Sequence, residues 1–419
     1  MAQPKGPSGP FVDHIVIDGG INPAVDDFIR ESIDRAHIRG ARALIIQLDT
    51  PGGLLTSTQT IVKEILGAPV PVIVYVAPSG AGAGSAGVFI TMAGHIAAMA
   101  PGTTIGAAHP VAGGGQEVKG VMGEKIENFT ASFSEAIAQK RGRNTEFAIQ
   151  AVRRSVSITE KEALEKKVID IVANNINDLL KQADGKKVDV NGSDHTLSLK
   201  DLQVVQFEMS LKQIIINLLS DPNLAYLLLM AGILGLYMEF SHPGVIFPGV
   251  AGAIAFLLAL TSFQIIPFNY SGLLLMLLGI SLLVGEAFMP SFGVLGIGGI
   301  ISLALGSLLL FDTEGSDLTV DHSIVFTAVG TVGVLMFILA YLVFRSQKSK
   351  PTLGFEGLVG ETGEVRIKLD PRGKVFVHGE YWHAEGDEEV AAGEKVKIVG
   401  FEGMSLKVKR LAGKFSIND

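Results

Sequence analysis

The chain has 419 residues, more than a single hydrophobic core of ordinary size accommodates, so we expect at least two domains. A hydrophobic fraction of 48% and a mean hydropathy of +0.40 are high for a soluble enzyme. The net charge of −8 gives no reason to expect a nucleic-acid partner. The absence of cysteine from the sequence excludes disulfides, thiol catalysis and cysteine metal sites.

The first half of the chain alternates strand-like and helix-like segments. Three apolar runs are typical of buried strands: Val12–Ile17, Ala43–Leu48 and Val70–Val76. Helical patterns begin at Asn22-Pro23 and at Leu54, and a proline in the first turn fits the start of a helix. This alternation predicts an α/β domain with mostly parallel strands over residues 11–205.

Two glycine-rich turns of this domain bear on function. Gly52-Gly53 lies between a strand and a helix, where backbone can approach a ligand without a Cβ in the way, although a tight turn alone also explains it. The segment from Gly80 to Gly87 places Ser85 at the mouth of a helix. A serine there either caps the helix or acts as a nucleophile with backbone N–H groups behind it. Neither turn has the spacing of a Walker-type phosphate loop, and together they supply what acyl transfer needs.

A nucleophilic serine needs a base, and the sequence offers two kinds. His109 lies in a loop and is the best imidazole, because His95 follows Ser85 by ten positions in one helix, about 15 Å away. Lys125 lies in a helix predicted from Met122 to Arg141. It stands at the margin of a stripe of apolar residues: Met122, Ile126, Phe129, Phe133 and Ile137. We expect partial burial to lower the pKa of Lys125, the alternative being an ammonium that extends into water.

Charges almost vanish between Leu224 and Phe344, which predicts a transmembrane region over residues 223–345. It contains five apolar stretches: Leu224–Met238, Gly244–Phe268, Leu273–Gly285, Phe288–Phe311 and Ser323–Phe344. The second, fourth and fifth are long enough to span a bilayer, whereas the first and third are short enough to be re-entrant, so we expect three to five spans. The preceding residues 206–222 predict an amphipathic helix that lies against the membrane surface.

An internal repeat with an offset of 47 residues runs through the transmembrane region. Four residues recur in order: Glu239, Pro243, Gly249 and Gly252 become Glu286, Pro290, Gly296 and Gly299. The repeat predicts two units that pack closely through glycines. The two glutamates lie at membrane–loop borders, where a proton or ion pathway and a plain interfacial position are both open.

The charges around the spans predict the topology. An odd number of spans places the terminal domains on opposite sides, and Arg345, Lys348 and Lys350 mark the end of the last span as cytoplasmic. We therefore expect the first domain outside the cytosol and the C-terminal domain inside it. Because Met1–Pro10 has no apolar segment, we also expect that an original signal peptide has been replaced by a start methionine.

Five short strand-like runs separated by glycine-containing turns fill residues 354–411 and predict a small barrel. Trp382 is the only tryptophan of the chain, and we expect it in the barrel core. Without a row of aromatic residues, and with an acidic run at Asp387–Glu389, the barrel is predicted to bind protein rather than nucleic acid.

Four features of the first domain carry a family resemblance: Leu48-Asp-Thr-Pro-Gly-Gly53, Ser85-Ala-Gly87, Met99-Ala-Pro-Gly-Thr-Thr-Ile-Gly-Ala107, and Lys125 forty positions after the serine. They resemble the NfeD family of membrane serine proteases, whose protease domain is similar to Clp protease and signal peptide peptidase A. The C-terminal runs resemble the soluble NfeD domain, an OB-like barrel. The resemblance implies an α/β Clp/crotonase-like spiral domain, an all-α transmembrane bundle and a small all-β OB-like barrel.

The activity that the resemblance implies is that of a membrane-anchored serine endopeptidase. It assigns the catalytic dyad to Ser85 and Lys125, and the oxyanion hole to Gly52, Gly53 and the backbone N–H of Ala86. It further implies apolar segments of a stomatin-like (SPFH) membrane protein as substrate, a homo-oligomer in contact with membrane lipid, and neither a metal nor another cofactor.

One departure and two alternatives accompany this reading. The approach to the serine, Gly80 to Gly84, is rich in glycine and alanine where bulkier residues are expected, which bears on substrate specificity. The same fold would serve a crotonase-type acyl-CoA enzyme. The chain would equally serve as a non-catalytic membrane scaffold that binds stomatin-like proteins.

Overall fold

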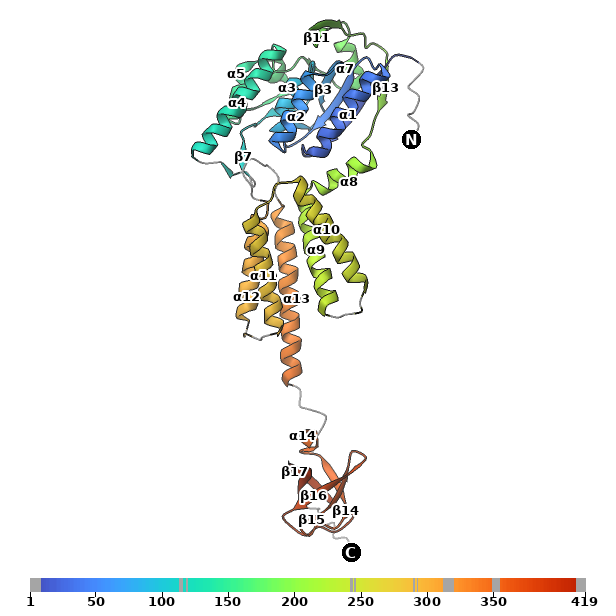
Figure 1. Cartoon of the computed structure of the whole chain (residues 1–419), viewed down its shortest axis with the longest axis vertical. Helices are drawn as coiled ribbons and strands as arrows, with labels where there is room; N and C mark the ends of the chain where they lie inside the picture. The colour runs from blue at the N-terminus through green and yellow to red at the C-terminus, as the bar shows by residue number, and fades with distance from the viewer. Residues whose placement is uncertain are drawn as a thin grey trace. The chain divides into compact units, whose positions relative to one another are not determined.

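The computed structural model describes residues 9–112, 116–117, 120–241, 244, 246–288, 291, 293–311, 320–348 and 355–411 (Figure 1). The chain divides into two compact units, Met1–Gly333 and Val334–Asp419. The first unit contains an α/β domain and apolar helices, and the second contains a β-barrel.

A six-stranded parallel sheet forms the centre of the α/β domain, in the order β10-β5-β3-β2-β1-β13. Its strands are β1 Phe11–Asp18, β2 Leu44–Asp49, β3 Val72–Val76, β5 Ile96–Met99, β10 Ile171–Val172 and β13 Gln203–Gln206. The central strands are apolar on both faces, as sheets covered on both sides require. The predicted α/β class with parallel strands is therefore confirmed.

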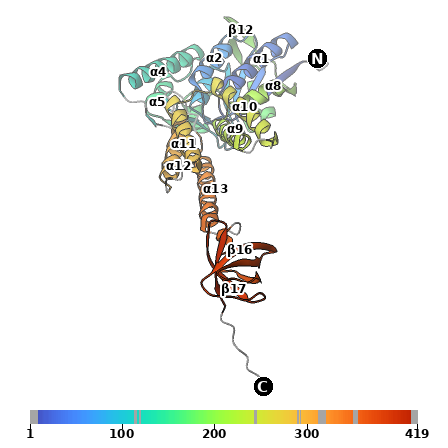
Figure 2. The same cartoon turned by 60° about the horizontal axis from the view of Figure 1, so that its bottom comes forward.

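Seven helices belong to the described part of this domain: α1 Pro23–Arg39, α2 Leu55–Leu66, α3 Ala86–Ala93, α4 Val121–Arg141, α5 Thr145–Arg153, α6 Glu160–Glu165 and α7 Ile176–Ala183. The predicted start of α1 is confirmed, because the Asn22 side chain accepts hydrogen bonds from the Ala24 and Val25 N–H groups. Helices lie on both faces of the sheet (Figures 1 and 2). One hydrophobic cluster lies between the sheet and the helices on each face.

A second, three-stranded sheet combines β4 Gly82–Gly84, β6 Thr104–Gly106 and β9 Ser157–Thr159. Two short hairpins complete the domain: β7 Val111–Ala112 with β8 Gln116–Glu117, and β11 Lys187–Val190 with β12 Ser193–Thr196. Asn191 and Gly192 both have positive φ in the second hairpin, the turn geometry that an Asn-Gly pair favours.

The apolar region forms helices α9 Pro222–Ser241, α10 Ile246–Ile265, α11 Tyr270–Phe288, α12 Val294–Leu309 and α13 His322–Lys348, preceded by α8 Leu211–Leu219. The expected division into short and long stretches is wrong. The first and third stretches form helices of 20 and 19 residues, and the fourth forms a helix of only 16. Among the described residues, Pro222–Phe240 and Ile246–Ile265 are long and apolar enough to cross a membrane.

The predicted repeat corresponds to two helical hairpins with equivalent contacts. A Cβ on Gly232 of α9 would lie 2.7 Å from the Phe256 backbone of α10, and a Cβ on Gly279 of α11 would lie 2.6 Å from the Leu303 backbone of α12. Both pairs are related by the offset of 47. Within each hairpin the helices therefore approach as closely as glycine allows.

Glu286, the second glutamate of the repeat, is hydrogen-bonded to residues at the start of α12. The Glu286 carboxylate accepts hydrogen bonds from the Ser291 hydroxyl at 2.5 Å and from the Gly293 and Gly296 N–H groups at 3.0 and 3.2 Å. These groups surround the start of α12, where an anion is stabilised by unpaired N–H groups. The position of Glu286 is that of a helix cap, which accounts for the residue without an ion pathway.

The C-terminal unit is a closed five-stranded barrel in the order β14-β15-β16-β18-β17. Its strands are β14 Thr362–Ile367, β15 Arg372–Val377, β16 Glu380–Gly386, β17 Lys395–Glu402 and β18 Ser405–Arg410, after a short helix, α14 Phe355–Leu358. Trp382 is partly buried against the apolar core, close to its expected place. The predicted small all-β barrel is confirmed.

Candidate active site

Ser85 occupies a strained turn between strand β4 and helix α3. Its φ is +45° and its ψ is −108°, a conformation that non-glycine residues rarely adopt. Its side chain makes no capping hydrogen bond to the described backbone of α3, so capping does not explain the serine. Backbone strain of this kind costs about 1–3 kcal/mol and persists where the surroundings impose it, which is frequent at functional sites.

The glycine-rich approach to Ser85 is explained by close backbone packing. A Cβ on Gly84 would lie 2.9 Å from the Pro51 carbonyl oxygen, and a Cβ on Gly87 would lie 2.8 Å from Thr50 Cγ2. Strand β4 is held there because the Thr50 N–H donates to the Gly82 carbonyl and the Gly84 N–H donates to the Thr50 carbonyl, both at 2.9 Å. Bulkier residues would push the serine away from the turn after β2.

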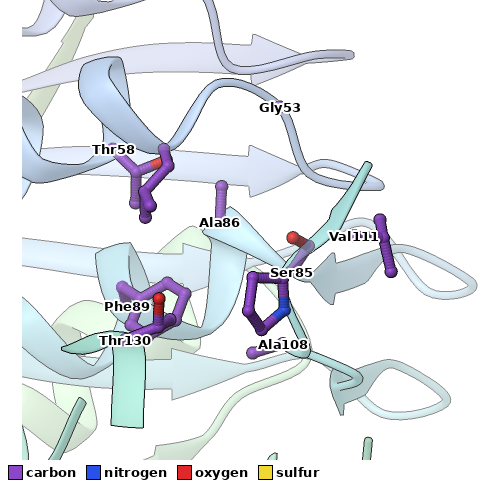
Figure 3. Close-up of a pocket in the computed structure, with 10 residues that line it drawn as sticks. Gly53, Thr58, Ser85, Ala86, Phe89, Ala108, Val111 and Thr130 are labelled. Atoms are coloured by element: carbon purple, nitrogen blue, oxygen red, sulfur yellow. The ribbon is translucent and has the colours of Figure 1, made fainter. Parts of the chain in front are cut away.

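Ser85 lines a cavity of about 30 Å³, which has room for one or two water-sized groups. The residues that surround it come from the turn after β2, from α2, from Ser85 and α3, from the segment before α4 and from α4: Gly53, Leu55, Thr58, Ser85, Ala86, Phe89, Ala108, Pro110, Val111 and Thr130. Figure 3 shows Ser85 beside Val111, below the turn that carries Gly53, with Phe89 and Thr130 at the other end. The cavity walls are mostly apolar, and hydroxyls stand at both ends.

Three backbone N–H groups assigned to an oxyanion hole differ in their availability. The Gly52 N–H donates to the Thr50 hydroxyl at 3.1 Å and is therefore already used. Within the described part of the chain, no hydrogen bond uses the Gly53 N–H, while Ala86 contributes the first N–H of α3, which has no partner within its own helix. Gly53 and Ala86 both line the cavity, so two donors remain beside Ser85.

Gly53 itself is required by the fold. Its φ is +153°, and a Cβ there would lie 2.2 Å from the Ile21 carbonyl oxygen. The Leu54 N–H donates to that carbonyl at 2.9 Å, and the Ile21 N–H donates to the Gly52 carbonyl at 2.8 Å. This ladder between the end of β1 and the turn after β2 orients the Gly53 peptide.

Sequence reasoning missed Thr130, whose side chain lines the cavity from α4. Only 1% of Thr130 is exposed, and its hydroxyl has no hydrogen-bond partner among the described residues. An unpartnered buried hydroxyl costs about 1–3 kcal/mol, and at the cavity wall this hydroxyl is available to a group bound there. The signal available in the sequence was a hydroxyl residue on the face of α4 that also carries Ala131, Ser134, Ile137 and Ala138.

The expected burial of Lys125 is wrong. Lys125 is exposed on α4 and is not among the described residues that line the cavity. Two members of its predicted apolar stripe are also exposed, Met122 by 55% and Phe129 by 56%. Lys125 therefore lies outside the described lining of the cavity, on the solvent-exposed side of the first turns of α4.

Neither histidine candidate replaces the lysine. The ring of His109 has its Nδ1 at 2.8 Å from the Val152 carbonyl oxygen, and His109 is not among the cavity-lining residues described. His95 accepts a hydrogen bond from the Val72 N–H, and burial, with Arg141 and Arg143 nearby, lowers its pKa to about 3. No cluster of three or more potential metal ligands occurs in the described ranges.

Family models cover most of the chain. Residues 11–207 match the model described as NfeD1b, N-terminal domain; residues 223–344 match the NfeD integral membrane domain; and residues 355–410 match the NfeD-like C-terminal, partner-binding domain. A relative from Pyrococcus horikoshii, Membrane-bound protease PH1510, is 36% identical over 413 residues, which cover 95% of this chain and 93% of the relative. The chain belongs to the NfeD family.

Solved structures similar to this NfeD protein carry substitutions of a serine and a lysine. One is a serine-to-alanine mutant of 1510-N, a membrane-bound stomatin-specific protease, 36% identical, with a TM-score of 0.46 over 48% of this chain and 100% of that chain. Another is a lysine-to-alanine mutant of 1510-N in complex with a substrate peptide, 36% identical, with a TM-score of 0.47 over 50% and 97%. The predicted enzyme class, a protease, is confirmed for this NfeD chain by the membrane-bound protease that shares 36% identity over 95% of it.

Proposed function

We propose that the NfeD chain cleaves peptide bonds with Ser85 as its nucleophile. The observation that supports this most strongly is the conformation of Ser85, whose φ is +45°, beside a cavity that is bordered by the Gly53 and Ala86 N–H groups. A turn of this type exposes a hydroxyl at the mouth of a helix, in the way a nucleophile requires.

The chemical steps use these groups in order. The Ser85 hydroxyl oxygen forms a bond to the peptide carbonyl carbon while its proton passes to the general base. The carbonyl oxygen becomes an oxyanion that accepts hydrogen bonds from the Gly53 and Ala86 N–H groups. The Gly52 N–H, which donates to Thr50, holds the turn instead. Collapse breaks the C–N bond, the amine takes the proton from the base, and water then hydrolyses the acyl-serine.

Lys125 is the base in this proposal, and a second copy of the chain supplies the burial that it needs. A lysine acts as a base near neutral pH only when desolvation lowers its pKa. Lys125 is exposed, yet Met122, Phe129 and Val121 around it are apolar side chains exposed by 55%, 56% and 84%. A homo-oligomer that covers this surface would desolvate the ammonium and move the first turns of α4 towards the serine.

The substrate proposed is an apolar segment of a stomatin-like (SPFH) membrane protein. The cavity walls are mostly apolar, which suits an apolar peptide. The solved relative 1510-N is named as stomatin-specific, and the C-terminal barrel matches a partner-binding domain. In this proposal the protease domain, residues 11–205, cuts the substrate, and the barrel, residues 354–411, binds the partner. The transmembrane region, residues 223–345, anchors the protein in the membrane, and the linker helix, residues 206–222, connects it to the protease domain.

The family model shows that residues 223–344 form a membrane domain. We propose the sidedness from charge: Arg345, Lys348 and Lys350 lie at the C-terminal end of α13 and just beyond it, and favour the cytoplasmic side for the barrel. The protease domain would then lie on the extracytoplasmic side and cut its substrate there.

Peptide cleavage by the full chain in lipid vesicles tests the dyad. Ser85→Ala and Lys125→Ala should each lower cleavage of an apolar peptide by at least about a thousandfold, since removing one member of such a unit costs nearly as much as removing all. Ser79→Ala in the same turn segment and Lys140→Ala on the same helix are matched controls. Loss in His109→Ala with activity retained in Lys125→Ala would instead assign the base to the histidine.

The two alternatives have their own readouts in the same preparation. Retained binding of a stomatin-like protein with no cleavage by the unmodified chain would favour a scaffold. Acyl-CoA turnover without peptide cleavage would favour a crotonase-type enzyme.

A further inference from the structure

Helix α8, Leu211–Leu219, has its apolar side outward and its polar side inward. Four apolar side chains are exposed: Leu211 by 73%, Ile214 by 43%, Ile215 by 47% and Leu218 by 54%. By contrast, only 1% of Gln213 is exposed. The four residues lie at positions i, i+3, i+4 and i+7 and therefore share one face, which we name the α8 stripe.

Polar contacts hold the opposite face of α8 against α1. The Gln213 side-chain amide donates to the Glu31 carboxylate at 2.8 Å and to Asp27 at 3.3 Å. The Asn22 side chain donates to the Asn217 side-chain oxygen at 2.7 Å. These bonds set the rotation of α8 about its axis, so the stripe cannot turn inward without breaking them.

Gln213 is held at both ends of its amide. Its side-chain oxygen accepts hydrogen bonds from the Ser210 N–H at 2.9 Å and from the Ser210 hydroxyl at 2.8 Å, which forms a capping box at the start of α8. The same side chain thus starts the helix and docks it on the α/β domain. A polar residue at the centre of a buried contact, facing two carboxylates, specifies the orientation of the helix.

The stripe lies immediately before a membrane helix. Helix α8 ends at Leu219 and α9 begins at Pro222, and the Asp221 carboxylate caps α9 by accepting from the Asn223 and Leu224 N–H groups at 2.7 and 3.2 Å. Residues 222–240 are apolar and long enough to cross a bilayer. The α8 stripe is therefore within a few residues of the point where the chain enters the membrane.

We propose that the α8 stripe lies in the boundary between headgroups and acyl chains of the bilayer. The Gln213 and Asn217 contacts fix α8 on the protease domain, so that the stripe holds this domain at the membrane surface. A nine-residue helix is about 14 Å long, and four side chains fall well short of the roughly 1,000 Å² that a stable protein interface needs. The same stripe is sufficient beside a membrane helix, which already holds it at the surface. Lys212, exposed at its flank, suits anionic headgroups.

Site-specific labelling tests this position, and the absence of cysteine from the sequence makes each introduced thiol unique. The full chain carrying Ile215→Cys, and separately Leu218→Cys, is labelled with an environment-sensitive fluorophore and reconstituted in phosphatidylcholine–phosphatidylglycerol vesicles. The control is Ile38→Cys, 73% exposed at the far end of α1. We expect strong quenching of both α8 labels by a nitroxide carried on lipid. Quenching by aqueous iodide should be several-fold weaker than for Ile38→Cys.

Two outcomes would overturn the proposal. One is equal iodide quenching of the α8 and Ile38 labels in vesicles, which would place the stripe in water. The other is rapid disulfide formation between two copies of unlabelled Ile215→Cys in vesicles, which would show that a second copy covers the stripe. Neither reading depends on peptide cleavage, so the test stands apart from the assignment of Ser85 and Lys125.

Discussion

The two residues assigned to catalysis lie in contrasting surroundings. Ser85 is fixed by backbone hydrogen bonds on both sides of its turn, including the Ser85 N–H to the Gly106 carbonyl at 3.2 Å. Lys125 lies on the exposed first turns of α4. In the proposed mechanism, the single chain therefore preorganises the nucleophile and the oxyanion donors, whereas the base depends on what covers α4.

Helix α4 itself shows the same contrast between its ends. Near its C-terminal end, Ile137 and Ala138 are buried, and Arg143 just beyond donates to Asp170 at 2.6 Å and to the Gly94 carbonyl at 2.9 Å. At its N-terminal end, Val121 and Met122 are exposed. An anchored end beside an uncovered one is the arrangement that allows assembly to complete a site.

The largest effect should come from a substitution in the turn that carries the Gly53 N–H beside Ser85. Gly53→Ala would place a Cβ 2.2 Å from the Ile21 carbonyl at a φ of +153°, so we expect a loss of about 4 kcal/mol in stability together with all cleavage. Chemical denaturation and peptide cleavage measure both. Gly67→Ala, at a φ of −94°, is the control and should change stability by less than about 1 kcal/mol. A folded and active Gly53→Ala protein would contradict the oxyanion assignment.

Removing the anchor of α4 should have the next largest effect. Arg143→Met takes away a buried guanidinium and leaves the half-buried Asp170 carboxylate without its ion pair, so we expect about 3 kcal/mol of destabilisation. Hydrogen exchange along α4 and β5 would report it. Lys140→Ala, which removes only an exposed ion pair with Asp189, should have little effect. Equal effects of the two substitutions would show that α4 is held elsewhere.

Acid should loosen the same anchored end. Burial lowers the pKa of His95 from 6.5 to about 3, so the unfolded chain binds a proton that the folded chain refuses. Stability is therefore full above pH 6.5 and falls by about 1.4 kcal/mol per pH unit below it, until the pH nears 3. Hydrogen exchange in β3, where Val72 donates to His95, measures this slope. The slope should be shallower in His95→Asn, and an unchanged slope would assign it to other groups.

The smallest effect should fall on assembly alone. Phe129→Asp adds a charge to the exposed apolar surface of α4, where no described core contact is lost, so stability of the single chain should be unchanged. If a second copy covers this surface, cleavage should fall about tenfold or more, equivalent to about 1.4 kcal/mol, together with a shift towards monomer. Sedimentation in detergent and peptide cleavage test both. Exposed Ile38→Asp on α1 is the control.

Local patterns were sufficient where one segment carried all the information. The start of α1 followed from Asn22-Pro23, the β11–β12 turn from Asn191-Gly192, and the barrel from short runs between glycines. The positions of Ser85 and Gly53 at strand–helix turns followed in the same way. Helix lengths in the apolar region did not, because the apolar stretches and the helices have different ends: Leu224–Met238 is shorter than α9, and Phe288–Phe311 is longer than α12.

The amino-acid sequence alone determined the order of domains, the parallel α/β core, the closed barrel and the serine at the mouth of α3, since each depends on short-range chemistry. Only the tertiary structure decided which apolar faces are covered. Periodicity assigns Met122 and Phe129 to one side of α4, and Ile214 and Ile215 to one side of α8, but it does not say what packs against them. Burial is a property of neighbours distant in sequence. For that reason the hydrogen bond that uses the Gly52 N–H, the buried hydroxyl of Thr130 and the exposure of Lys125 emerged only from the folded chain.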